Sequence, residues 1–254
     1  MLGFAYERLH KQSQSKKDLD EQITAFRHGL ELAPLPDRTQ SFNNIASALR
    51  TRFDQWGASN DLDKAISLCQ EALLLKPAPH PDRAWLLHSI AITLHTRFAQ
   101  WGASNDLDEA ISLHREALFL WPASHSHRIS SLKSLANAIK SRFEQRGASN
   151  DFHEAISLYQ EVLLLHPAPH LDCAGSLNNL ATTLHTRFEE RGTSNDLDEA
   201  ISMYQEALLL WSAPDSYHSM LLKNLGNIRK NVIWKSFSIS CQFPKTGNLG
   251  KLWK

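Results

Sequence analysis

Histidines and clustered carboxylates are the side chains in this sequence whose types and spacing suggest chemistry. Among the 13 histidines, His125 and His127 lie two residues apart, which is a weak match to a metal site. The sequence contains no HExxH segment and no zinc-type Cys/His spacing, so we predict no metal and no cofactor. The acids Asp106, Asp108 and Glu109 have counterparts in similar segments elsewhere in the chain. We interpret them as a capping box at a helix N-terminus.

Two short segments resemble enzyme motifs but lack the residues on which those motifs depend. Residues 147–151 read Gly-Ala-Ser-Asn-Asp and do not match the GxSxG elbow of hydrolases. Residues 247–251 are too short for a P-loop and lack its Ser or Thr. We therefore predict that the chain is not an enzyme.

Polar and basic residues recur at intervals of 45 residues and suit the binding of a peptide. Lys and Arg attract carboxylates, Asn bonds an extended backbone, and Trp packs against an apolar side chain. His95 and His185 would strengthen the binding of an acidic segment below about pH 6.5. The alternative is that these residues are simply solvated. Ser47 and Thr182 are further candidates, and the main candidates are Asn43, Arg50, Trp85, His88, His95, Lys133, Asn137, Lys140, Asn178, His185, Lys223, Asn227 and Lys230.

A third recurring position carries arginine, each time followed by Phe. We expect these arginines to pair with acids of a neighbouring repeat or with carbonyl groups at a helix end. Trp56 and Trp101 recur nearby, and later copies carry Arg there; the two indoles either pack beneath a loop or form a second contact surface. The recurring arginines are Arg52, Arg97, Arg142 and Arg187.

A repeat of 45 residues must position all of these side chains. Residues 102–113 read Gly-Ala-Ser-Asn-Asp-Leu-Asp-Glu-Ala-Ile-Ser-Leu, and near-identical copies begin at Gly57, Gly147 and Gly192. A weaker copy begins at Asp18. A fixed period of this length is typical of repeat architectures, in which each unit packs only on its neighbours.

Each repeat has the apolar spacing of two helices. In residues 82–101 and 106–121, apolar residues recur at steps of three and four, and Gly102 and Pro122 fit the helix ends. Small residues such as Ala91 and Ala110 occupy fixed sites that allow close packing. We predict first helices near residues 37–56, 82–101, 127–146, 172–191 and 215–233, after a partial one at 1–10. We predict second helices near residues 18–33, 61–76, 106–121, 151–166 and 196–211.

These residues resemble a tetratricopeptide repeat (TPR). The second helix carries Ala110, His114, Ala117, Leu120 and Pro122 in a TPR-like series, and residues 180–184 repeat Leu-Ala-x-x-Leu. The usual repeat has roughly 34 residues, and longer turns account for the longer period here. The extended unit is similar to fungal arrays that are often joined to CHAT or nucleotide-binding switch domains. HEAT and armadillo repeats have a similar period but lack this pattern of small residues.

The resemblance implies an all-α superhelical solenoid of antiparallel helix pairs, with about five repeats plus a terminal helix. It also implies that the first helices line a concave groove for an extended peptide or a partner helix. A non-enzymatic protein-protein interaction scaffold is therefore the expected function, and an acidic partner is one option. In the alternative, the chain is a fragment of a larger protein whose array controls a CHAT-type protease or a switch domain.

Composition narrows the classes of partner. Lys plus Arg and Asp plus Glu both number 27, which argues against a general nucleic-acid binder. Residues 1–12 lack the apolar core of a signal peptide, and the sequence has no apolar run long enough for a membrane span. Three scattered cysteines suggest a reducing compartment, so we expect a cytoplasmic location and no membrane partner. The oligomeric state stays open, because the partial first repeat offers an end for stacking.

The repeat pattern ends near Asn231. We assign residues 1–233 to the repeat array and expect residues 234–254 to form a disordered or atypical tail. Truncation of a longer gene and a short basic tail are both compatible with this change of pattern.

Overall fold

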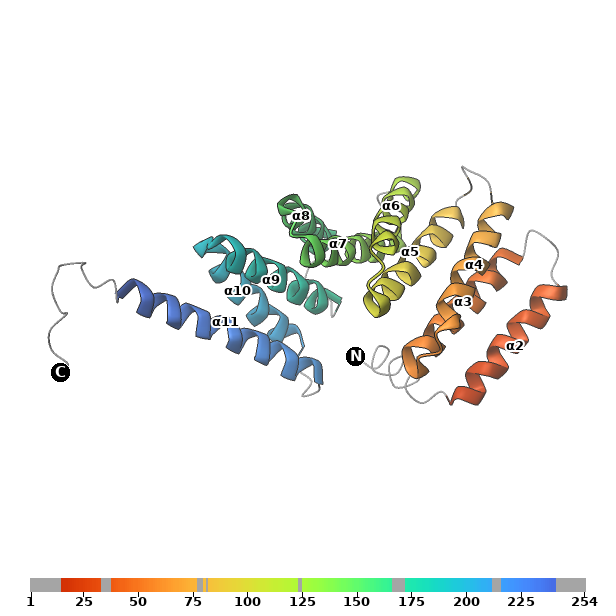
Figure 1. Cartoon of the computed structure of the whole chain (residues 1–254), viewed down its shortest axis with the longest axis horizontal. Coiled ribbons are helices and arrows are strands. Elements are labelled where there is room, and N and C mark those ends of the chain that lie inside the picture. The colour runs from red at the N-terminus through yellow and green to blue at the C-terminus, as the bar shows by residue number, and fades with distance from the viewer. Residues whose placement is uncertain are drawn as a thin grey trace, which may run out of the picture. The chain divides into compact units, whose positions relative to one another are not determined.

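The computed structural model describes residues 15–32, 38–76, 80, 82–122, 125–165, 172–211 and 216–240. All regular structure within these ranges is α-helical (Figure 1). The helices are α2 (Lys16–Leu32), α3 (Arg38–Trp56), α4 (Asn60–Leu75), α5 (Asp82–Trp101), α6 (Ser104–Leu120), α7 (Ser126–Arg146), α8 (Ser149–Leu165), α9 (Asp172–Arg191), α10 (Ser194–Leu210) and α11 (Ser216–Ser240).

The helices pack as antiparallel pairs joined by short turns. Within each repeat, α3 packs on α4, α5 on α6, and α9 on α10. Successive repeats meet where α2 packs on α3, α4 on α5, α6 on α7, and α10 on α11. This arrangement confirms the predicted all-α repeat fold of helix pairs.

The chain divides into two compact units, Met1–Leu158 and Tyr159–Lys254, with the division inside α8. In the first unit, α3 also contacts α5, and α5 contacts α7, so the first helices of successive repeats lie next to one another. In the second unit, α9 and α11 make the corresponding contact. The three first helices of the first unit provide the surface on which most of the predicted binding residues lie.

Glycine ends the first helix of each repeat, as the sequence predicts. Gly57, Gly102, Gly147 and Gly192 have φ angles of 67°, 72°, 68° and 72°. Their N–H groups each donate to the carbonyl oxygen of the Phe four residues earlier, over 2.7 Å. Residues with a side chain rarely adopt this left-handed conformation, so glycine allows the chain to reverse within a few residues.

Alanines occupy the closest helix contacts. Ala65, Ala91 and Ala110 have no or almost no exposed surface and belong to one apolar cluster with Ile90 and Leu94. A small side chain lets two helix backbones approach, and larger neighbours then fill the remaining volume. The predicted small-residue sites are therefore confirmed as core positions.

The predicted capping box of the second helix is wrong. Helix α6 begins at Ser104, and its N-cap residue, Ala103, makes no side-chain hydrogen bond. Asp106 lies within the first turn, and its carboxylate binds Arg97. A reciprocal capping box does occur in the weaker first copy, where the Ser15 N–H donates to Asp18 Oδ2 (3.1 Å) and the Asp18 N–H to Ser15 Oγ (3.2 Å).

The recurring arginines have a structural role, as the sequence predicts, but their shared partner is an acid of their own repeat and not the predicted acid of a neighbouring one. Arg97 Nε and Nη2 donate to the two carboxylate oxygens of Asp106 at 2.6 and 2.7 Å, and Nη1 donates to Asp63 of the preceding repeat at 2.7 Å. These hydrogen bonds raise the pKa of Arg97. Each arginine thus ties the turn of its own repeat together. Arg97 and Arg52 also reach an acid of the previous repeat, Asp63 and Asp20 respectively. The equivalent forks join Arg52 to Asp61, Arg142 to Asp151 and Arg187 to Asp196.

Replacing Arg97 by Met is expected to lower the free energy of unfolding by about 2 kcal/mol. The substitution removes both Arg97 donors to the buried Asp106 carboxylate. Because Arg97 itself is partly exposed, the loss is smaller than for a fully buried ion pair. Urea unfolding followed by circular dichroism measures the loss. Arg115→Met is the matched control, because Arg115 is exposed and its pair with Glu154 should contribute less than about 1 kcal/mol. Equal losses in the two variants would contradict the role assigned to Arg97.

The C-terminal helix is longer than predicted. Helix α11 continues to Ser240, past the expected end of the array at residue 233. The remaining residues of the predicted tail, with Cys241, lie outside the described residues, as do residues 1–10 and most of the proline-rich turn at 77–81. No helix in the described part of the chain is both long and apolar enough to cross a membrane.

Candidate functional site

The first row of predicted binding residues is used mainly for contacts between repeats. Asn43, His88 and Asn178 are at most 9% exposed. Asn43 Oδ1 accepts a hydrogen bond from Ser89 Oγ (2.8 Å), and Asn178 Oδ1 accepts one from Asn224 Nδ2 (3.3 Å). The prediction that these three side chains face a ligand is therefore wrong. In the same row, Lys133 is half-buried and Lys223 is exposed.

The second row is only partly accessible, and acids of the chain itself offset its positive charge. Lys140 Nζ lies 3.3 Å from Glu144 Oε1, and His185 Nε2 lies 3.5 Å from Glu189 Oε1. Asp54 follows Arg50 by four residues, as Glu144 follows Lys140. Burial lowers the pKa of Arg50, and the negative charge of Asp54 offsets part of this effect. These carboxylates weaken the argument for an acidic partner. The side chain of Lys230 lies outside the described part of the chain.

His95 differs from the other members of this row. Its Nε2 lies 3.0 Å from Ser141 Oγ in the next repeat. Burial lowers the pKa of His95, and Glu144 offsets only part of this effect. The neutral imidazole is therefore favoured near pH 6.5, and the prediction that His95 gains charge there and attracts acids is wrong.

Of the three repeat positions predicted to bind a peptide, the third is the most accessible. Ser47 is exposed, and Ile92 and Asn137 are half-buried, on three successive first helices of the first unit. In the second unit, Asn227 is exposed, while Thr182 bonds the Asn178 carbonyl and the Tyr204 hydroxyl. Ile92 is not among the predicted binding residues, which are polar, charged or aromatic. Periodicity alone indicates this position, since Ile92 lies 45 residues from both Ser47 and Asn137.

Lys133 lies one helical turn before Asn137 on α7. No ion pair of Lys133 occurs among the described residues. Together with Ser47, Ile92 and Asn137, this lysine forms an accessible strip across α3, α5 and α7, which we call the α3–α7 strip. Its side chains can donate and accept hydrogen bonds, contact an apolar group and bind one carboxylate.

Aromatic and imidazole rings form a cluster beside this strip. The His88 ring centre lies 5.2 Å from that of His114 and 5.6 Å from that of Trp121. Trp85 packs on His127 with a separation of 4.5 Å. Trp85 is therefore only half available to a ligand. The packing role predicted for His114 is confirmed, since its side chain is completely buried.

The same cluster explains the closely spaced histidines. His125 Nδ1 accepts a hydrogen bond from the His127 N–H and thereby caps α7. The His125 ring stacks on Trp121 with 5.4 Å between ring centres. Within the described residues, no group of three or more His, Cys, Asp or Glu side chains is arranged to hold a metal ion.

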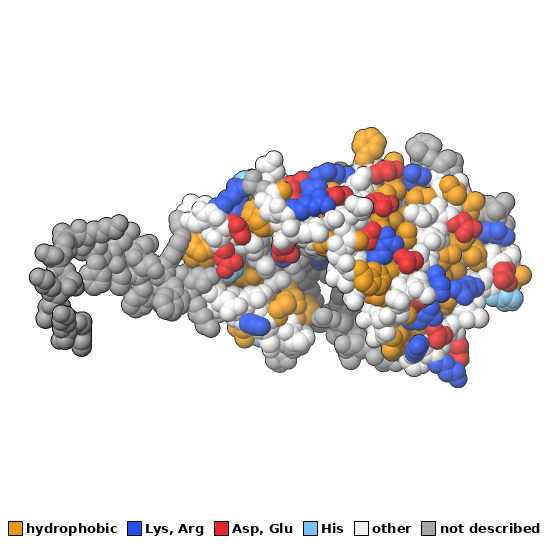
Figure 2. All heavy atoms as spheres, in the orientation of Figure 1, with side chains coloured by type: hydrophobic (Ala, Val, Ile, Leu, Met, Phe, Trp, Pro, Cys, Tyr) orange, Lys and Arg blue, Asp and Glu red, His pale blue; other side chains and the backbone are white. Residues whose placement is uncertain are grey.

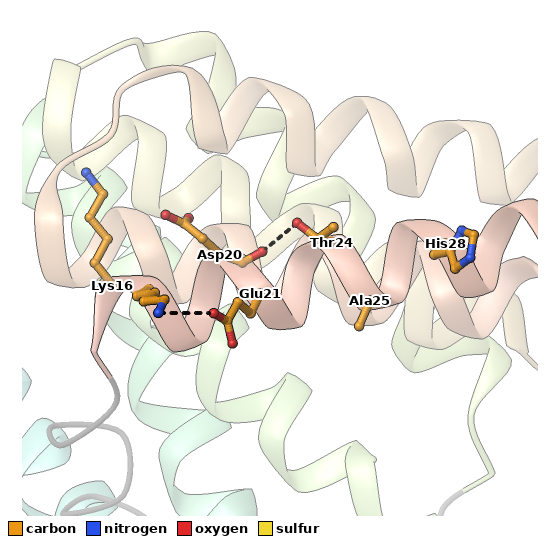
Figure 3. Close-up of a pocket in the computed structure, with 7 residues that line it drawn as sticks. Lys16, Asp20, Glu21, Thr24, Ala25 and His28 are labelled. Carbon is orange, nitrogen blue, oxygen red and sulfur yellow. Dashed lines mark hydrogen bonds and ion pairs between the residues drawn. The ribbon is translucent and has the colours of Figure 1, made fainter.

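A hollow of about 760 Å³ lies along α2, and all the described residues that line it belong to that helix. Figure 3 shows Asp20, Thr24 and His28 spaced along it. Thr24 Oγ1 donates to the Asp20 carbonyl (2.8 Å), and Lys17 pairs with Glu21. These are ordinary contacts within a helix, so the hollow has no convergent set of polar groups.

Charges of both signs are mixed on one face of the molecule (Figure 2). On the face shown in Figure 2, acidic and basic side chains alternate over the helices, with apolar side chains between them. This face therefore carries no broad field of one sign, and local groups determine what each part of it can bind.

Comparisons with known proteins support the repeat type. The tetratricopeptide repeat family matches residues 38–82 and 173–210. The structure of BtubC (BKLC) from P. vanneervenii has a TM-score of 0.60 and 18% identity, and the match covers 93% of this chain and 98% of that one. A putative kinesin light chain with TPR-like repeats from Podosopora anserina has a TM-score of 0.53 and 16% identity, covering 77% of this chain and 92% of that one. No curated protein matches the sequence.

Proposed function

We propose that this array of tetratricopeptide-like helix pairs binds an extended polypeptide along the α3–α7 strip. The fold itself fits a protein-interaction role, since tetratricopeptide repeats generally mediate binding between proteins. The observation that supports this site is the accessible strip formed by Ser47, Ile92, Asn137 and Lys133 on three adjacent first helices.

Each member of the strip offers a different contact. Asn137 can bond the backbone of an extended chain, and Ile92 can cover a small apolar side chain. Lys133 can pair with one carboxylate of the ligand. We expect a short segment with a single acid near its centre to bind better than a strongly acidic one, because Glu144 and Asp54 would repel additional negative charge.

Replacing Lys133 by Glu is expected to weaken the binding of such a segment at least tenfold, which is about 1.4 kcal/mol. The probes are peptides of about twelve residues selected from a random display library, and calorimetry with the purified chain gives their dissociation constants. Lys64→Glu is the control, because Lys64 is an exposed lysine of α4 outside the strip.

Two results would contradict this site. One is equal weakening by Lys133→Glu and Lys64→Glu, which would indicate only a long-range effect of charge. The other is unchanged affinity in both Lys133→Glu and Asn137→Ala, which would place the selected peptides on a different surface.

A further inference from the structure

A second candidate binding surface lies between the first two complete repeats, at the opposite end of the first helices from Trp85. It is an open cleft of about 500 Å³ between the end of α3, its turn into α4, and the last turns of α5. Trp101 is 48% exposed there, and its ring centre lies 5.8 Å from that of Phe53. The other lining residues are Asp54, Gly57, Ser59, Thr96, Ala99 and Gln100.

The ionisable side chain that lines this cleft is acidic. Asp54 is exposed and is the one ionisable group among the described residues that line the cleft. Asp63 lies one turn into α4, outside the set of lining residues. Its carboxylate is 62% exposed, although one oxygen binds Arg97. Asp54 lies near Arg50, but a carboxylate has about four acceptor positions and can take further donors.

The next junction along the chain shows what occupies the equivalent place. There, the position of Trp101 is taken by Arg146, and those of Ser59 and Asp63 by Ser104 and Asp108. Arg146 Nη1 and Nη2 donate to Asp108 Oδ1 and Oδ2 at 3.0 and 2.8 Å, and Nη2 also donates to the Ser104 carbonyl at 3.4 Å. At that junction, a guanidinium of the chain itself is bound.

The first junction keeps the acceptors but lacks the arginine. Asp63 corresponds to Asp108, which accommodates Arg146 while Arg142 also approaches within 4.0 Å. Trp101 in place of arginine adds an exposed indole face, and guanidinium groups stack favourably on indole. Asp54, where the next repeat has Ala99, adds a second carboxylate.

We propose that this cleft binds an arginine side chain supplied by a partner polypeptide. The guanidinium stacks on Trp101 and is held by the carboxylates of Asp54 and Asp63, as Arg146 is held by Asp108. The site differs from the α3–α7 strip in both position and preferred charge.

Fluorescence anisotropy of a labelled peptide that alternates Ser and Arg tests this proposal with the full chain. The same peptide with citrulline, which keeps the shape but lacks the charge, should bind at least tenfold more weakly. A lysine peptide should fall between them, because an ammonium group lacks the planar fork that pairs with carboxylates.

Two variants introduce the residue that the next repeat has at the equivalent position. Trp101→Arg places the chain's own guanidinium in the cleft, as Arg146 does, and Asp54→Ala reproduces Ala99. Each should weaken the binding of the arginine peptide at least tenfold while preserving the helical circular dichroism spectrum. If Trp101→Arg loses its fold, Asp54→Ala decides the question.

Glu109→Ala is the control, since Glu109 is an exposed acid of α6 outside the cleft; its affinity should equal that of the parent. Lys133→Glu should likewise leave the arginine peptide bound, so failure of the strip and failure of the cleft are distinguishable. Equal binding of the citrulline peptide, or parental affinity in Asp54→Ala, would overturn the proposal.

Discussion

Replacing Ala110 by Trp is expected to lower the free energy of unfolding of the first unit by about 3 kcal/mol or more. Ala110 has no exposed surface and packs in one cluster with Ile90, Ala91 and Leu94. An indole at this site cannot be accommodated without separating α5 from α6, and overpacking of a close-packed core is costly. Urea unfolding monitored by circular dichroism provides the measurement.

The loss should also change the shape of the transition. In a repeat protein, stability depends on contacts between neighbouring repeats, so damage at one pair of helices uncouples the repeats on either side. We expect a broader transition with a smaller urea dependence. Glu109→Trp adds the same side chain at an adjacent exposed position and should unfold like the parent. A parental transition in Ala110→Trp would mean that the helix register is wrong.

The sequence predicts the helix pairs well because the same packing problem recurs in each repeat. Residues 82–101 were predicted as one helix, and α5 has these bounds. The apolar spacing fixes the buried face, and Gly102 fixes the end, so local signals agree with the tertiary contacts. The second helices begin earlier than predicted, because Asp106 was assigned to the cap.

The roles of individual polar residues are less predictable. The rows that contain Arg97 and Asp106 are both visible in the sequence, but nothing in the spacing shows that they bind each other across the turn. The same limitation applies to Asn43. Its position in the repeat is equivalent to that of Lys133. Asn43 is nevertheless buried and accepts a hydrogen bond from Ser89, whereas Lys133 is half-buried. The exposure of a side chain depends on the residues of the neighbouring repeat, and the repeat period of the sequence does not predict it.

The buried histidines give the second large effect, a loss of stability in mild acid. His88 and His114 lie 5.2 Å apart between ring centres in the first unit. His88 Nδ1 and His114 Nε2 are buried and have no hydrogen-bond partner among the described residues. Burial, together with the positive charges of Arg50 and His127, lowers the pKa of His88 to about 4. Burial, His88 and His95 lower the pKa of His114 well below its usual value.

The sign of the effect follows from these pKa values. In the unfolded chain, histidine takes up its proton near pH 6.5, whereas folded His88 takes it up only near pH 4. Between these values the unfolded chain binds more protons, so the free energy of unfolding falls as the pH is lowered. For His88 alone, the difference between the two pKa values corresponds to a loss of about 3 kcal/mol in the free energy of unfolding. This loss is complete below pH 4. His114 adds to this loss.

Urea unfolding at intervals between pH 7 and pH 4 measures this dependence, and a double variant, His88→Asn with His114→Phe, should flatten it. The chain already uses Asn43 and Phe26 at the equivalent positions, and Ser134 stands where Ser89 bonds Asn43, so the new Asn has a potential donor. His28→Gln, at an exposed position of α2, is the control and should keep the parental slope. Because carboxylates titrate alike in all three proteins, the difference between the slopes isolates the two buried rings. A double variant that loses as much stability as the parent between pH 6.5 and pH 4 would show that protonation of these histidines does not limit the acid stability of the first unit.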